Sequence, residues 1–402
     1  MKTAYLYDAI RSPRGLAREQ GALHQVTPFE LLKQLYQALQ DRSALRIVDV
    51  DDVMLGCVSQ YGEQGGNIAR ASAVYAGWPD HVPGLTLSRF CSSSLDASCL
   101  AADRIAAGSC EVLVTGGVES MSRVPMLADK PSWMIDPEMV HKTRTVPLGN
   151  AADLIATEEG FSREVLDRYA LQSQQRAKRA QTNGHFSDSM ISIKRPDGVT
   201  VDQDEAIRGD TTMQQLATLE PAFAVSGARG FDAALLKLHP HLTAIEHNHT
   251  VGNAPGMVDG ASLLLVGSKS LAARINARPR FEILGYRTCC GPVEKVLTGG
   301  ILAAQQLLDQ HKLTVQDLDL VEFNESFAGP TLKFIQDLGL DPECVNVNGG
   351  AISLGHPMGA TGGVLTGMLM EELLRRDQEL GLVAVCGATG SGTAMLIRRC
   401  GS

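Results

Sequence analysis

The feature that most constrains the fold is a repeat of strands and helices across the two halves of the chain. Short apolar runs alternate with stretches of helical apolar spacing, a pattern typical of α/β proteins with largely parallel sheets. A helix over residues 31–39, an acidic turn and a strand over 53–58 correspond to a helix over 301–308, an acidic turn and a strand over 320–324. Any two α/β segments share some likeness, but the common order favours a duplicated fold.

Buried strands and amphipathic helices are expected throughout this repeat. The expected strands cover residues 1–10, 54–58, 85–87, 111–115, 262–266, 320–323, 345–347, 382–386 and 394–397. The expected helices cover residues 29–40, 94–107, 163–180, 301–309 and 362–376.

One long stretch has no counterpart in the repeat, and it is richer in charge and proline. We therefore expect three parts: a first half over 1–118 that is completed by 248–275, an inserted loop domain over 119–247, and a second half over 276–402. Long insertions of this kind usually carry function.

Composition excludes several classes of protein. The 36 basic and 45 acidic residues give a net charge of −9 without a basic block, which disfavours nucleic-acid binding. No apolar run approaches the ~18 residues of a membrane span. The nine cysteines form no CxxC pair, and their odd number in a chain without a leader predicts reduced thiols and a cytoplasmic location. His247 and His249 have metal-like spacing but no nearby third ligand, so no metal is expected.

Reactive side chains lie where strands of both halves end, the place where open α/β sheets hold ligands. They are Cys91, Asn324, His356 and Cys386. Cys91 stands at an expected strand-to-helix turn, where Ser92–Ser94 offer helix caps and the helix dipole would lower the pKa of the thiol. An inert core thiol is the alternative for a lone cysteine. The other three residues favour a catalytic nucleophile instead.

These segments resemble the thiolase superfamily, essentially from end to end. The resemblance rests on Gly116–Ser122, Asn324–Ala328, the Gly-His-Pro block at 355–357 and the Cys-Gly loop at 386–387. The segment around Cys91 would also suit a β-ketoacyl synthase, a relative with the same duplicated core. Synthases carry a histidine of an HGT motif where this chain has Asn324, and they lack a counterpart of Cys386. The thiolase interpretation is therefore favoured.

The resemblance implies a five-layered αβαβα fold and a set of catalytic roles. Cys91 would be acylated, and His356 would take its proton and then help to hold the thioester oxygen of the enolate. Asn324 would position a water in that oxyanion site, and Cys386 would carry the proton to or from the α-carbon or the CoA thiol. Backbone N–H groups of Cys91 and Ala388 would form a second oxyanion hole.

The resemblance also assigns CoA binding to the insertion and to a loop that follows it. The residues so assigned are Arg208, Thr211, Leu216, Phe223, Asn253, Pro255, Gly256, Met257 and Phe327. Many thiolases have serine where Pro255 stands, and Pro255 cannot donate the corresponding hydrogen bond. Pro147-Leu148-Gly149 likewise replaces the His-Met-Gly of many short-chain biosynthetic members.

The function implied is reversible, CoA-dependent thiolysis of 3-ketoacyl-CoA to acyl-CoA and acetyl-CoA. The departures at Pro147 and Pro255 favour a degradative enzyme for chains beyond acetoacetyl-CoA; acetoacetyl-CoA thiolase is the alternative. A catalytically silent protein that binds CoA or lipid is a third possibility, which the four filled catalytic positions disfavour. No permanently bound cofactor is expected, since CoA is a substrate, and family members are homodimers or homotetramers.

Overall fold

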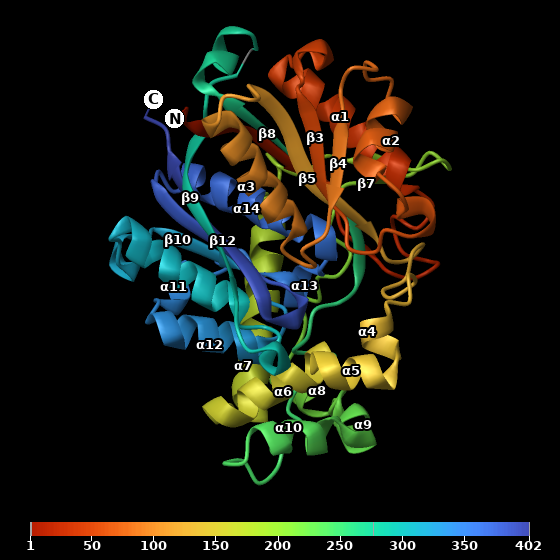
Figure 1. Ribbon diagram of the computed structural model, residues 1–402, viewed down its shortest axis with the longest axis vertical. Helices are drawn as coiled ribbons and strands as arrows, with labels where there is room; N and C mark the ends of the chain where they lie inside the picture. Colours follow the sequence, from red (N-terminus) through yellow and green to blue (C-terminus); the bar gives the residue numbers. More distant parts are fainter. Residues whose placement is uncertain (1, 276, 402) are drawn as a thin grey trace.

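The architecture of the protein is a stack of five layers, as expected from the sequence. The computed structural model describes residues 2–275 and 277–401, and two half-sheets alternate there with three layers of helices (Figure 1). Separate apolar clusters join the helices to the sheets. The outer helices of the first half are α1 (Pro28–Ser43) and α2 (Ile68–Tyr75). The central ones are α3 (Ser93–Ala106) and α14 (Thr361–Arg375), and the outer ones of the second half are α11 (Gly299–His311) and α12 (Ala328–Leu338).

Although the two half-sheets form separate layers, they are hydrogen-bonded to each other along one edge, so that their strands follow one another in a single continuous order. The joint is an antiparallel pairing in which Tyr5 faces Glu282 and Leu6 faces Phe281. From the outer edge of the first half, the strands are β4 (Gly84–Leu87), β3 (Asp52–Gly56), β5 (Val112–Ser120), β8 (Val258–Ser268) and β1 (Ala4–Arg11). They continue as β9 (Phe281–Cys290), β12 (Ser391–Arg399), β11 (Leu380–Cys386) and β10 (Leu320–Phe323), while β2 (Gly15–Leu16) pairs with β8.

The expectation of largely parallel sheets is wrong. Among the strands that the structure describes, parallel ladders form only between β3 and β4, β3 and β5, and β10 and β11. In each half a later strand returns antiparallel beside its predecessor, β8 along β5 and β12 along β11. Apolar runs cannot reveal this direction, because a strand that is buried on both faces looks the same in either direction.

The strand expected over 345–347 is also wrong, since only Val345 forms a bridge, with Val321. The next residue, Asn346, has a left-handed φ of 48° and its side chain replaces the missing strand. Its Oδ1 accepts from Phe323 N at 2.8 Å, and its Nδ2 donates to Phe323 O at 2.9 Å. The amide thus satisfies the backbone groups that a neighbouring strand would satisfy.

The duplication is visible in how equivalent strands are connected. In the second half β11 and β12 are joined by the short turn over 387–390, whereas in the first half β5 and β8 are separated by residues 121–257. The helices of this long segment are α4 (Ser132–Ile135), α5 (Pro137–Thr143), α6 (Leu148–Glu159), α7 (Arg163–Thr182), α8 (Met213–Ala217), α9 (Ala224–Ser226) and α10 (Asp232–Leu238). It also holds the hairpin of β6 (Ile193–Lys194) and β7 (Thr200–Val201).

A buried ion pair attaches the long segment to the first strand. Both oxygens of Asp204 accept from the Arg11 guanidinium at 2.9 Å, and Oδ1 also accepts from Arg14 N. Both paired side chains are about 1% exposed. Within the described ranges, no helix has the length and apolar character needed to cross a membrane.

We predict that Asp204→Asn lowers the free energy of unfolding by about 3 kcal/mol, because it leaves the buried Arg11 charge without its counter-charge. Urea unfolding monitored by circular dichroism measures this difference. Asp202→Asn, an exposed change of the same kind two residues away, should stay within about 0.5 kcal/mol of the parent. Equal effects of the two substitutions would contradict the anchoring role of Asp204.

Candidate active site

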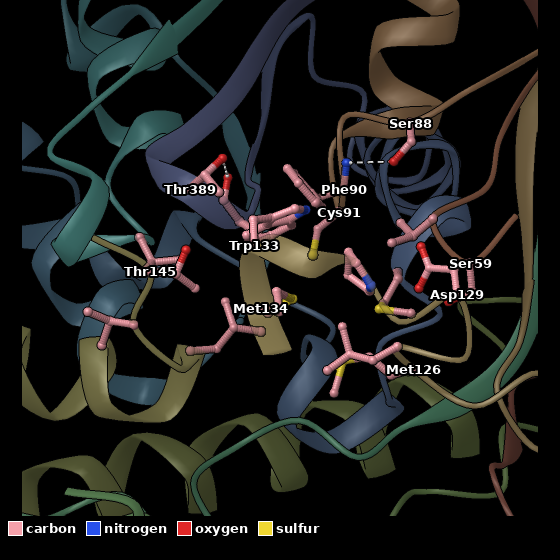
Figure 2. A pocket seen from close by; sticks show the side chains of 18 of the residues that line it. Ser59, Ser88, Phe90, Cys91, Met126, Asp129, Trp133, Met134, Thr145 and Thr389 are labelled. Atoms are coloured by element: carbon pink, nitrogen blue, oxygen red, sulfur yellow. Dashed lines mark hydrogen bonds between the residues drawn. The ribbon is translucent and has the colours of Figure 1, made fainter. Parts of the chain in front are cut away.

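Cys91 stands where the sequence places it, in the turn between β4 and α3. Phe90, directly before it, has a left-handed φ of 52°, so the chain turns sharply at this point. Figure 2 shows the thiol reaching into a cavity of about 340 Å³ whose lining includes Cys91. Cys91 is otherwise buried, with 8% of its surface exposed. A ligand in the cavity therefore reaches a thiol that bulk water scarcely reaches.

The serines after Cys91 do not cap the helix as expected. Ser92 Oγ instead donates to Val385 O at 3.1 Å, beside Cys386. Ser94 Oγ accepts from Gly363 N at 2.9 Å, in the helix that follows the His356 turn. These hydrogen bonds cross from the first half of the chain to the second, so they fix the Cys91 turn against the segments that carry the other reactive residues.

Both cysteines of the site carry neutral thiols at rest. Burial, together with the nearby Cys386 and Glu119, raises the pKa of Cys91 to about 12. Burial likewise raises the pKa of Cys386 to about 12, and its Sγ lies 3.2 Å from Leu297 O. The expectation that the helix dipole lowers the pKa of Cys91 is wrong, because removal from water outweighs the effect of the helix.

His356 is held as a neutral base. Its Nδ1 lies 2.7 Å from Thr361 Oγ1, and burial together with the nearby Arg14 charge lowers its pKa to about 4. Gly355, with a φ of 86°, precedes it; a Cβ there would lie 2.2 Å from the side chain of Val258. His356 N also donates to Gly256 O at 3.0 Å. The imidazole can therefore accept a proton, while its ring and backbone stay fixed.

Asn324 faces the other ring nitrogen of this histidine. Its Nδ2 lies 3.5 Å from His356 Nε2 and 3.0 Å from Ser326 Oγ, and its backbone N donates to Ala384 O. Its buried Oδ1 has no hydrogen-bond partner among the described protein atoms. A buried amide oxygen without a partner is suited to hold a water or a substrate donor. The structure thus brings Asn324 and His356 together, as the sequence predicts.

Two buried carboxylates that the sequence analysis gave no role position these segments. Glu119 accepts from the backbone N–H groups of Val58, Ser59 and Gly359 at 2.9–3.0 Å, which joins the loop after β3 to the turn after His356. Glu325 accepts from Tyr169, Ser173, Asn346 and the Ile352 N–H. Their position inside the quoted motifs, at 119 and 325, was the available signal.

The cavity at Cys91 is mainly apolar. Its lining includes aromatic and aliphatic side chains of the long segment, and Ala388 and Thr389 of the loop after Cys386. Trp133 packs edge-on against Phe90, with ring centroids 5.8 Å apart. The segment that forms the cavity wall is therefore attached directly beside Cys91. Of this wall, the sequence analysis had singled out only Leu148, within Pro147-Leu148-Gly149; the apolar residues over 126–134 carried no motif that would mark them.

A second, more polar cavity of about 460 Å³ contains several of the residues assigned to CoA. Arg208, Thr211, Leu216 and Gly256 line it, and Arg208 is exposed. Because Gly256 O accepts from His356 N, this cavity borders the segment that pairs with the histidine.

The other residues assigned to CoA do not line that cavity. The Asn253 amide is used within its own loop, donating to Asp167 at 2.8 Å and accepting from Thr250 N. Phe223 and Phe327 pack against each other with ring centroids 5.6 Å apart. Pro255 is half-buried and Met257 is exposed in the same loop as Gly256.

His247 and His249 hold their loop against helix α6 through hydrogen bonds. Both contact Asp153 at 2.8 Å, and His249 Nε2 accepts from Gly329 N. A separate group of Glu158, His239 and His241 brings three potential metal-ligand atoms within 4.8 Å of one another. The expectation that the chain holds no metal therefore stays a prediction.

Comparisons with known proteins agree with this architecture. Residues 5–230 match the family description "Thiolase, N-terminal domain" and residues 277–399 match "Thiolase, C-terminal domain". The chain is 34% identical to the 3-oxoadipyl-CoA/3-oxo-5,6-dehydrosuberyl-CoA thiolase of Escherichia coli strain K12, over 99% of this chain and 100% of the relative. It is 32% identical to the 3-ketoacyl-CoA thiolase of Bacillus subtilis strain 168, over 100% of both chains.

A solved structure extends the likeness to the fold. The crystal structure of the Bacillus anthracis acetyl-CoA acetyltransferase superposes with a TM-score of 0.86 at 33% identity, over 100% of this chain and 99% of that one. Family descriptions on both halves, relatives along the full length and the shared fold lead to one conclusion: this chain belongs to the thiolase family of acyltransferases.

Proposed function

We propose that this enzyme cleaves 3-ketoacyl-CoA thiolytically, through an acyl-Cys91 intermediate, and that it serves acyl groups longer than acetyl. The observation that carries the proposal is that Cys91 lines an apolar cavity, while Gly256, whose carbonyl accepts from His356 N, lines a polar one. An acyl tail would occupy the first cavity and the CoA arm would enter through the second. The reacting carbonyl would then lie between them.

The first half of the reaction forms the acyl-enzyme. His356 accepts the proton of the Cys91 thiol, and Sγ attacks the 3-keto carbon, whose oxygen is held by the N–H groups of Cys91 and Ala388. The bond between C2 and C3 then breaks, leaving the acyl group on Cys91 and an acetyl-CoA enolate. His356 and a water held by Asn324 stabilise the enolate oxygen, and Cys386 protonates C2. Each preorganised donor of this kind is worth about 3 kcal/mol.

The second half of the reaction returns each proton to the residue that held it at the start. The Cys386 thiolate takes the proton of the incoming CoA thiol, and the CoA sulfur attacks the acyl carbon on Cys91. Acyl-CoA leaves, and the Cys91 thiolate recovers its proton from His356. Splitting one displacement into two steps in this way is the general advantage of a covalent intermediate.

Recognition of CoA is proposed for the polar cavity and its surroundings. Arg208 is exposed at this cavity and can approach a phosphate, while Thr211, Leu216 and Gly256 line the path of the pantetheine arm. Asn253, Pro255 and Met257 shape the loop of Gly256, and Phe223 and Phe327 pack behind it. Their contribution is therefore to the shape of the site.

The compartment and the oligomeric state of the enzyme are proposed from its free thiols and its edge strand. All nine cysteines are free, which supports a cytoplasmic, reducing environment and a degradative role there. Strand β4 forms an outer edge of the sheet, and Leu85 on it is 41% exposed. An exposed strand edge of this kind favours pairing with a second copy, so we propose a homodimer, alone or as half of a homotetramer.

We predict that Cys386→Ala separates the two kinds of chemistry. Acetyl-CoA should still acetylate Cys91, because acyl transfer needs mainly Cys91, His356 and the backbone donors, and a thiolate of CoA can leave without the proton that Cys386 supplies, whereas a carbanion cannot. Thiolysis of a 3-ketoacyl-CoA should fall by at least about 10³-fold, because the α-carbon loses its proton donor. Intact-protein mass spectrometry reports the acetyl group, and loss of the keto-enolate absorbance reports turnover.

Cys110→Ala, which removes a buried thiol outside the site, should change neither measurement. If the Cys386 variant turned over at near the parental rate, proton transfer by Cys386 would be refuted. A parent protein that neither acetylates nor turns over would instead be the silent CoA-binding protein.

A second prediction concerns pH. With a pKa of about 4, His356 stays neutral down to mildly acidic pH, and proton transfer from Cys91 changes no net charge of the pair. Single-turnover acetylation should therefore vary less than about threefold between pH 5.5 and 7.0. A histidine of ordinary pKa, about 6.5, would lose most of its neutral form over that range and slow the reaction about eightfold. Quench-flow mass spectrometry measures the rate.

The third prediction concerns chain length. In thiolysis, kcat/KM for 3-ketohexanoyl-CoA should exceed that for acetoacetyl-CoA at least about tenfold. Its two further methylenes would be buried in the apolar cavity at about 0.8 kcal/mol each. A panel of 3-ketoacyl-CoA substrates of increasing length measures the ratio. A preference for acetoacetyl-CoA would establish the short-chain alternative.

A further inference from the structure

Resting on the thiolytic activity proposed above, we infer that Asp129, at the apolar cavity of Cys91, makes the enzyme select acyl groups with neutral tails and reject tails that end in a carboxylate. The argument begins with the chemistry of the cavity. Its apolar wall is supplied mainly by the segment after β5 and by the turn at 293–296, through Met126, Leu127, Trp133, Met134, Val146, Leu148, Val293 and Val296. Such a wall stabilises methylene groups, and the polar side chains that share the lining, Ser59, Gln60, Ser88, Thr145 and Thr389, are uncharged and supply no counter-charge.

The charge in the cavity has one sign. Among the described residues that line it, Asp129 is the only acidic one, and none is lysine, arginine or histidine. Nearby cations have other partners: Arg123 binds Glu63, and Arg144 lies 3.5 Å from Glu294. Lys130, the next residue, is exposed and does not line the cavity. A carboxylate tail would therefore meet a like charge and no cation.

Asp129 is positioned with respect to the nucleophile. In the view of Figure 2, Asp129 and Trp133 lie on opposite sides of the Cys91 thiol. Trp133 is attached to Phe90, directly before Cys91, by the edge-on ring contact at 5.8 Å. The carboxylate and the wall thus belong to one short segment that is held beside the reacting sulfur.

This selectivity separates the chain from one of its relatives. The Escherichia coli thiolase is named for 3-oxoadipyl-CoA, whose acyl group ends in a carboxylate. Placing that group in the present cavity would remove part of its water and set it near Asp129, which is exposed but lines the cavity. Like-charge contacts and buried charges without a partner both oppose binding strongly. A full-length likeness at 34% identity therefore does not carry this substrate over to the present chain.

The test compares two acyl donors that differ at one end. Butyryl-CoA and succinyl-CoA have four-carbon acyl groups that end in a methyl and in a carboxylate, and each would acylate Cys91. Mass spectrometry of the intact protein gives both rates. We expect the butyryl rate to exceed the succinyl rate by at least about 50-fold, since a like-charge contact costs more than one factor of ten.

Variants assign the selectivity to Asp129. Asp129→Asn should lower the butyryl-to-succinyl ratio at least about fivefold, and Asp129→Lys, which supplies a cation, should lower it further. Glu138→Gln removes the same charge from an exposed position of α5 that does not line the cavity, so it should leave the ratio unchanged. A ratio that the Asp129 variants do not move would overturn the role of Asp129.

The outcomes distinguish this inference from the proposed function. Equal acylation by both donors would overturn the selectivity and leave the thiolase reaction standing. Acylation by neither would overturn the reaction, and calorimetric binding of the two acyl-CoAs to the Cys91→Ala variant would then decide the selectivity alone. There, tighter binding of butyryl-CoA by at least about tenfold supports the inference, and equal affinity contradicts it.

Discussion

The site depends on two buried carboxylates that are satisfied by hydrogen bonds from neutral groups. Glu119 joins the loop after β3 to the turn after His356, and Glu325 joins the loop after Asn324 to α7 and α13 (Ala351–Leu354). A buried carboxylate without donors is costly, so each one holds its surrounding N–H and O–H groups in a single arrangement. Burial raises the pKa of both carboxyls, while these hydrogen bonds lower it. Segments far apart in the sequence are thereby fixed around one point.

The Cys91 thiol and the His356 imidazole, which lie among these segments, are uncharged at rest. Burial raises the pKa of the Cys91 thiol and lowers the pKa of His356, so neither forms an ion before substrate arrives. Charge would then develop only during the reaction, inside a region of low dielectric where fixed donors act strongly. An uncharged pair also requires less compensation from the surrounding protein than a buried thiolate and imidazolium would.

The features that could be predicted from the sequence are those that produce a periodic apolar pattern or a recognisable motif. The duplicated core, the long helices and the positions of Cys91, Asn324 and Cys386 at strand ends could be predicted because buried apolar runs and glycine-rich turns mark them, whereas His356 follows the short helix α13 and not a strand. Strand β9 was missed because polar and half-buried residues such as Tyr286 and Arg287 interrupt its apolar pattern. The direction of β8 and the side-chain substitute for a strand at Asn346 depend on tertiary contacts. The pKa of Cys91 could not be predicted either, because the extent of burial is a property of the folded protein.

The unequal connections between equivalent strands have a consequence for how such an enzyme can change. The groups proposed to make and break bonds lie on the two similar halves, whereas the segment between β5 and β8 supplies most of the lining of the polar cavity and a large part of the lining of the apolar one. Much of the recognition is therefore encoded in a stretch of the polypeptide separate from the reacting groups. Substitutions within the intervening stretch can alter which molecule is accepted while the sheets and the reacting groups remain where they are. In the second half the equivalent strands are joined by a tight turn, so this connection contains no long segment that could vary.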